Sequence, residues 1–156
     1  IIEQRQPSFL LDGKLLITGE VDRTTEFEQG MPVHQAFKDG DWVPDPLIHD
    51  DQAAVLHVAD KGLVILTGCG HAGIVNIVRY TKRLTGVDQV YAVIGGFHLT
   101  GRLFEAIIPQ TVAALVAESP QVVVPAHCTG WTAQLALANA LPGVFTPNAV
   151  GSRFEL

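Results

Sequence analysis

Three of the six histidines follow short apolar runs that end in small residues, and this repeated pattern constrains the chain more than any other feature. Runs rich in Val, Ile and Leu predict buried β-strands. Strand ends at one edge of a sheet are neighbours in space, so we expect these imidazoles to share a cleft. Neutral imidazole binds transition metals, and histidine also transfers protons near neutral pH. The three are His71 after residues 63–66, His98 after residues 90–94, and His127 after residues 122–124.

From residue 53 onward, the apolar pattern predicts strands that alternate with helices. Strands at 53–58 and 63–66 should pair as a hairpin that joins strands 90–94 and 122–124 in one sheet. Helical spacing is expected between these strands, with Gly86 ending the first helix. The expected helices are 74–84, 103–118 and 132–140, and short closing strands are expected at 144–145 and 150–154.

The part before residue 53 is more irregular. Asp12-Gly13 separates two short apolar runs, and such a dipeptide predicts a β-hairpin. Residues 31–50 are rich in Pro, Asp and Gly and are predicted to form a long surface loop, which is often functional.

Composition narrows the class of protein. A length of 156 residues predicts a single domain, and a net charge of −6 without a basic stripe argues against a nucleic-acid partner. No apolar stretch reaches the roughly 20 residues that cross a membrane, and we expect no signal peptide at the start. Reduced thiols at Cys69 and Cys128 suit a cytoplasmic protein. Charged residues make up 17%, against about 25% in a typical domain, which indicates a very buried sheet or part of a larger fold.

The residues beside the histidines suggest further chemistry. A helix start after His71 would offer free N–H groups to an anion, and Thr129 and Gly130 would form a second anion-binding turn. Cys69 and Cys128 lie inside the histidine motifs, where reduced thiols beside a metal are favoured over a disulfide. Each histidine taken alone also has a structural interpretation, as a turn residue or a solvated side chain.

Three segments together resemble the metallo-β-lactamase superfamily. They are residues 67–76 (TGCGHAGIVN), 94–99 (IGGFHL) and 125–131 (PAHCTGW). They are similar to the branch of dihydropterin-ribofuranosylaminobenzene-phosphate synthase-like metal-dependent hydrolases. The resemblance implies an α/β protein, an αββα sandwich with one or two metal ions, usually zinc, at the sheet edges.

The chain departs from that family in one respect. The main metal motif of the superfamily, His-x-His-x-Asp-His, is absent. We therefore expect the single domain 1–156 to be the C-terminal part of the fold. The N-terminal half would be supplied by the same parent chain or by a partner chain, and a homo-oligomer is a further alternative.

The resemblance also implies roles for individual residues. His127 matches the last metal-ligand histidine, and His71 or Cys69 takes the place of another ligand. His98 has no counterpart in the general pattern of the superfamily, and we assign it either to substrate contact or to catalysis by proton transfer. Asn76, Thr129 and Gly130 are assigned to substrate binding.

The implied function is metal-activated hydrolysis of a small, phosphorylated or pterin-like substrate. A non-catalytic metal-binding or assembly module is the alternative. We expect the isolated chain to bind zinc weakly and to be inactive, because most ligands would lie in the other half.

Overall fold

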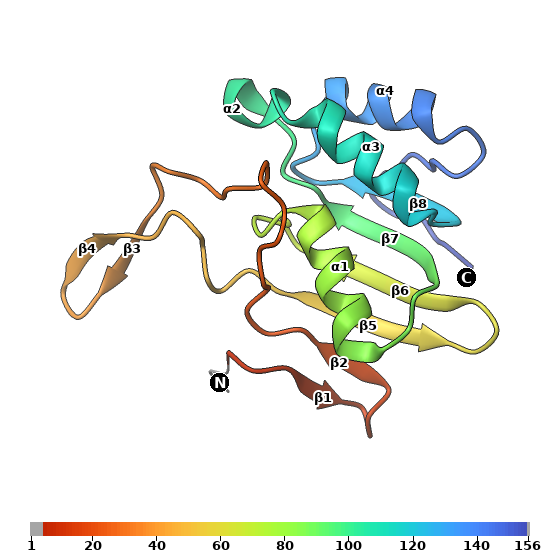
Figure 1. The fold of residues 1–156 in the computed structure, drawn as a ribbon, viewed down its shortest axis with the longest axis horizontal. Coiled ribbons are helices and arrows are strands. Elements are labelled where there is room, and N and C mark those ends of the chain that lie inside the picture. The colour runs from red at the N-terminus through yellow and green to blue at the C-terminus, as the bar shows by residue number, and fades with distance from the viewer. Residues whose placement is uncertain (1–4, 156) are drawn as a thin grey trace.

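The computed structural model describes residues 5–155 and shows one main sheet with helices packed on it, together with a separate hairpin (Figure 1). In sheet order, β1-β2-β5-β6-β7-β8, its strands are Ser8–Leu10, Leu15–Ile17, Ala53–Val58, Gly62–Thr67, Val90–Gly96 and Val122–Ala126. Strands β6, β7 and β8 run parallel to one another, and the other neighbours are antiparallel.

The predicted sheet is confirmed. Strands β5 and β6 pair as a hairpin from Ala53↔Thr67 to Val58↔Gly62 and lie in one sheet with β7 and β8. The turn at Asp12-Gly13 joins β1 to β2, as that dipeptide predicts.

The helices lie at the predicted positions, except that one predicted helix is divided into two. They are α1 (Ile74–Thr85), α2 (Gly101–Glu105), α3 (Ile108–Glu118) and α4 (Trp131–Ala140). Gly86 ends α1 in a left-handed conformation. The predicted helix at 103–118 is two helices, because Pro109 has no backbone N–H and fits only the first turn of α3.

Two predictions made for the irregular regions are wrong. Residues 31–50 contain a hairpin of β3 (Gln35–Lys38) and β4 (Asp41–Pro44), which projects from the body of the molecule (Figure 1). Its turn is Asp39-Gly40, with positive φ at both residues, and this turn chemistry favours a hairpin. The predicted closing strand at 144–145 is a single β-bridge, Val123↔Phe145, and the one predicted at 150–154 does not form.

The main sheet is apolar on both faces. Val55, Ile65 and Val93 lie on one face and belong to the core cluster that joins the sheet to the helices. The register places another apolar set on the opposite face, outside that cluster. This second set is Ala54, Leu56, Val64, Leu66, Ala92, Ile94, Val122 and Val124.

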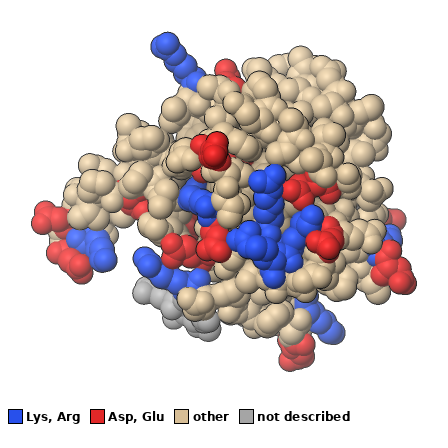
Figure 2. All heavy atoms as spheres, viewed as in Figure 1, with Lys and Arg blue, Asp and Glu red and all other residues tan. Residues whose placement is uncertain are grey.

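Basic side chains lie close together over α1. Figure 2 shows Lys and Arg side chains over α1, next to acidic residues. Arg79 and Lys82 of α1 both bind Glu118 of α3, at 3.1 and 2.9 Å, so this carboxylate ties the two helices together. None of the helices in residues 5–155 is long and apolar enough to cross a membrane.

Candidate functional site

The three predicted histidines follow the three parallel strands. His71 comes after β6, His98 after β7 and His127 after β8, so all three lie at the edge formed by the carboxyl ends of these strands. The turn after β6 packs directly on the end of β7, where the Gly96 N–H donates to Gly68 O at 2.8 Å. A Cβ at Gly96 would lie 2.9 Å from Cys128 Sγ, so glycine permits this close approach.

Two of these histidines have a strained backbone. The φ angles are 47° at His98 and 49° at His127, in the left-handed region that L-residues with a side chain rarely adopt. Such strain is concentrated at functional sites, where the surrounding structure maintains it. Both strand ends therefore hold an imidazole in a conformation that costs stability.

His71 and His98 form a pair. Their ring centroids are 4.4 Å apart in an edge-to-face arrangement, and the ring of Phe104 packs on His98 at the same distance. Burial lowers the pKa of His98, and the nearby imidazoles of His71 and His127 lower this pKa further, against the opposing effect of Asp51. His98 Nδ1 is buried and has no hydrogen-bond partner within the described residues. His98 is thus a neutral imidazole with an unused nitrogen.

His127 belongs to a second group of side chains with Cys69 and Cys128. His127 Nε2 lies 3.1 Å from Cys69 Sγ, and the Cys128 thiol donates to the Cys69 carbonyl oxygen at 3.1 Å. The nitrogen and the two sulfurs all lie within 4.8 Å of one another. Both cysteines are free, and burial raises the pKa of the Cys128 thiol to about 11. Two sulfurs and one imidazole nitrogen are a donor set that fits zinc.

Two of the three predicted metal ligands, Cys69 and His127, are therefore neighbours, whereas His71 pairs with His98 instead. The structure adds Cys128 to this cluster; the sequence analysis placed both thiols beside a metal but assigned only Cys69 as a ligand. Its position next to His127 in the sequence was the signal for it. The individual roles of these residues remain predictions.

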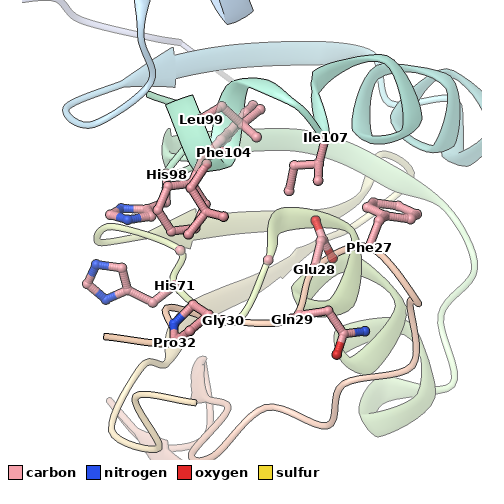
Figure 3. A pocket seen from close by; sticks show the side chains of 14 residues that line it. Phe27, Glu28, Gln29, Gly30, Pro32, His71, His98, Leu99, Phe104 and Ile107 are labelled. Atoms are coloured by element: carbon pink, nitrogen blue, oxygen red, sulfur yellow. The ribbon is translucent and has the colours of Figure 1, made fainter. Parts of the chain in front are cut away.

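A pocket of about 200 Å³ opens beside the histidine pair. Figure 3 shows His71 and His98 at one side of it and Phe27 and Ile107 at the other. Most of its remaining wall is apolar, from Phe97, Leu99, Leu103 and Phe104. Its shape and lining suit a small molecule with an apolar part.

The N-terminus of α1, which was expected to be open to an anion, is occupied by a side chain of this chain. The buried Glu28 carboxylate accepts the N–H groups of Val75 and Asn76 at 3.0 and 2.8 Å. Burial raises the pKa of Glu28, and these N–H donors partly offset that increase. Gly73 permits this contact, because a Cβ there would collide with the Glu28 side chain.

Two further residues, Asp51 and Arg23, contact the segment that carries His71. Neither was assigned to the site in the sequence analysis. Asp51 Oδ2 accepts the Ala72 N–H at 2.8 Å, while Oδ1 lies 3.9 Å from His71 Nδ1. Arg23 donates to the His71 carbonyl oxygen at 3.0 Å and to the Leu47 carbonyl oxygen. Both residues come from loops distant in sequence, so no local pattern predicts these contacts.

The three predicted substrate-binding residues hold loops together. The fully buried Asn76 side chain accepts the Thr24 and Thr25 N–H groups at 2.7 and 2.9 Å. Thr129 Oγ1 accepts the Phe97 N–H at 3.0 Å. The Gly130 N–H donates to Leu99 O, also at 3.0 Å. Their contact with a substrate remains a prediction.

Comparisons with known proteins identify relatives in sequence and in fold. No protein-family model matches the chain. It is 40% identical over 85 residues to the 7,8-dihydropterin-6-methyl-4-(beta-D-ribofuranosyl)-aminobenzene-5'-phosphate synthase of Methanocaldococcus jannaschii, covering 54% of this chain and 29% of that protein. It is 33% identical over 132 residues to the uncharacterized protein MJ0448 of the same organism, covering 85% of this chain and 46% of that protein.

A solved structure extends the match to the whole fold. Tm1679, described as a metal-dependent hydrolase of the β-lactamase superfamily, superposes with a TM-score of 0.83 at 25% identity. The match covers 99% of this chain and 57% of Tm1679, and the chain spans less than half of the two curated relatives. The chain thus has a metallo-β-lactamase-like α/β fold and resembles, in fold and sequence, the dihydropterin-ribofuranosylaminobenzene-phosphate synthase-like branch of that superfamily.

Proposed function

We propose that this chain forms part of a metal-dependent, hydrolase-like enzyme that acts on a small, phosphorylated or pterin-like substrate. One observation carries the proposal: a Cys and His cluster and a pair of histidines lie together beside an apolar pocket at the ends of three parallel strands. The names of the relatives support this class, because one is a metal-dependent hydrolase and another is a synthase of a pterin phosphate.

In this proposal the chain contributes metal ligands and a proton-transfer residue. Cys69 and His127 hold zinc or another divalent ion, and His71 reaches one of up to two ions. A bound ion of this kind lowers the pKa of a water molecule to about 7 and so supplies hydroxide at neutral pH. His98 is neutral and has an unused Nδ1, so it is able to accept a proton at that atom.

The pocket determines what part of a substrate is bound. Phe27, Phe104 and Ile107 offer apolar surface to a flat ring, and the volume of about 200 Å³ is small for a whole nucleotide-sized ligand. The buried Glu28 carboxylate lines the same pocket, which disfavours a phosphate there. A phosphate group of the substrate would therefore extend outside it.

The face of the main sheet that lies outside the core cluster is also apolar, which favours a second layer of structure packed on it. We infer that further chain covers Leu56, Leu66 and Ile94, supplied by the same parent chain or by a partner chain. Support comes from the aligned fraction of Tm1679, which is 57% of its length, and from the apolar residues on both faces. Free thiols at Cys69 and Cys128 suit a reducing compartment, so we place the protein in the cytoplasm.

A second candidate function is a metal-binding or assembly module without catalysis. The cluster of Cys69, His127 and Cys128 fits this alternative as well, because two sulfurs and an imidazole nitrogen can hold a metal ion whether or not a reaction follows.

Hydrolysis assays distinguish the two functions. The 156-residue chain and the longest natural chain that contains it are assayed with zinc, manganese or no metal on a panel of phosphate esters and pterin phosphates. We expect no turnover by the 156-residue chain and metal-dependent turnover by the longer chain. In the longer chain His98→Ala should reduce this turnover, and His57→Ala, at an exposed strand position, should leave it unchanged. If the longer chain binds metal but hydrolyses nothing in the panel, the module interpretation is favoured.

A further inference from the structure

We propose that Cys69, His127 and Cys128 together form a complete three-ligand site for one thiophilic divalent metal ion, with Cys128 as the third ligand. This inference deepens the proposed function by fixing where its metal binds. The binding itself depends only on the positions of these three side chains.

The donor atoms are already close to the spacing that such an ion needs. Zn–S bonds of 2.3 Å and Zn–N bonds of 2.0–2.1 Å place two tetrahedral ligands about 3.6–3.8 Å apart. The two sulfurs and His127 Nε2 lie within 4.8 Å of one another, and His127 Nε2 lies 3.1 Å from Cys69 Sγ. Small side-chain rotations therefore bring all three atoms into coordination range, and no movement of a strand is needed.

The cluster is open on one side. Cys69 and Cys128 are half-buried, whereas His127 is exposed to solvent. Within residues 5–155, no fourth His, Cys, Asp or Glu side chain joins the group. Structural zinc sites have four protein ligands, whereas catalytic sites have three protein ligands and a water molecule, and two cysteines with one histidine are an established catalytic set. Within the described residues the cluster therefore has the ligand number of a catalytic site, with one position left for water or for a residue of the further chain.

The backbone around the cluster holds both thiols in place. The Cys128 thiol donates to Cys69 O, which keeps the two cysteine side chains on the same side of the strand ends. Gly96 leaves room for them, since a Cβ there would lie 2.9 Å from Cys128 Sγ and 3.0 Å from Cys69 Cα. The ion would replace the thiol proton, and the hydrogen bond to the carbonyl would be released.

The proposal changes one expectation from the sequence. Weak zinc binding by the isolated chain was expected because most ligands would lie in the other half of the fold. With Cys128 the set is complete without His71. Two thiolates select zinc, cobalt or cadmium and disfavour magnesium and calcium, which prefer oxygen ligands.

Cobalt titration of the reduced 156-residue chain tests the site. We expect thiolate-to-cobalt charge-transfer absorption that saturates at one ion per chain, and one zinc per chain after equilibrium dialysis and elemental analysis. Cys128→Ser and Cys69→Ser should each weaken binding at least tenfold. The distant His57→Ala, at an exposed strand position, should retain both the absorption and the stoichiometry.

Two results would overturn the proposal. One is a folded chain that binds no cobalt or zinc. The other is binding that is lost in His71→Ala and kept in Cys128→Ser, which would place the ion at a histidine site. Mass spectrometry of the unmutated chain after alkylation gives a readout that is independent of variant folding. Zinc should protect both cysteines, and modification of Cys128 at an unchanged rate contradicts the proposal. Binding as expected without hydrolysis by the longer chain would contradict only the proposed function.

Discussion

The carboxylate of Asp51 lies on the Nδ1 side of the His71 ring, with Oδ1 3.9 Å from that nitrogen. This distance is too long for a direct hydrogen bond, so the carboxylate acts through its charge or through a bridging water. Its other oxygen is fixed by the Ala72 N–H, which makes the position of the charge definite. A carboxylate on the Nδ1 side of a histidine favours the tautomer with a proton on Nδ1, and this tautomer leaves Nε2 free to bind a metal.

Replacement of Asp51 by Asn should change the tautomer of His71. The amide oxygen still accepts the Ala72 N–H, but the negative charge is lost, so we expect a larger fraction of the Nε2–H form. Two-dimensional ¹H–¹⁵N spectra of the His71 ring measure the tautomer directly. If His71 binds metal, metal affinity or activity should fall by about 10–100-fold. Asp50→Asn, at the exposed neighbour, is the control, and an equal change in it would contradict this role for Asp51.

Glu28→Ala should destabilise the fold. It leaves the Val75 and Asn76 N–H groups at the start of α1 without an acceptor in a buried position. We expect the free energy of unfolding to fall by about 1–3 kcal/mol. Urea denaturation measures this change. Glu26→Ala removes an exposed carboxylate and should shift stability by less than about 0.5 kcal/mol.

Phe104→Ala should raise the pKa of His98 in the metal-free protein. Burial is the main cause of the lowered pKa, and the Phe104 ring covers one side of the imidazole. Removing that ring hydrates His98 and moves its pKa upward, toward the ordinary value of 6.5. An NMR titration of the His98 ring detects the shift. The neighbouring Leu103 is 55% exposed, so Leu103→Ala should leave the pKa of His98 closer to its original value.

The Glu118 ion pairs should give a pH-dependent contribution to stability. Burial opposes ionisation, but hydrogen bonds from Lys82 and Arg79 outweigh it and lower the pKa of Glu118 below 4.5. The contribution is therefore present above about pH 4.5 and is lost as the pH falls through the lowered value. At pH 7, Glu118→Gln should cost about 1–3 kcal/mol.

Denaturation curves at pH 7 and at acidic pH measure the effect. The difference between Glu118→Gln and the unmutated chain should shrink in acid, and a constant difference would show that the charge is not responsible. Asp22→Asn breaks the exposed ion pair with Arg83 and should change stability by less than about 1 kcal/mol.

The elements that the sequence predicted correctly are those determined by local pattern. The strand at 63–66 is a continuous apolar run, and the strand at 53–58 is apolar except at His57. Helix α1 has a helical spacing with a glycine stop, so each element can be recognised in a short window. The hairpin β3–β4 was missed because its strands are short and largely exposed, with little apolar alternation.

The supporting residues of the site were harder to predict. Glu28 reaches the start of α1 from 47 residues away, and Arg23 reaches His71 O from 48 residues away. Such contacts depend on the path of the loop before β3, which no local pattern specifies. Cys128 could be predicted more easily than Glu28 or Arg23, because it directly follows His127 in the sequence.

The left-handed backbone at His98 and His127 has a consequence for protein engineering. Glycine adopts these φ angles without the roughly 1–2 kcal/mol that a residue with a Cβ loses in this conformation. A screen that selects only for thermal stability would therefore favour glycine at both positions and remove both imidazoles. Stabilised versions of this chain need these two positions held fixed, because stability and side-chain chemistry favour different residues there.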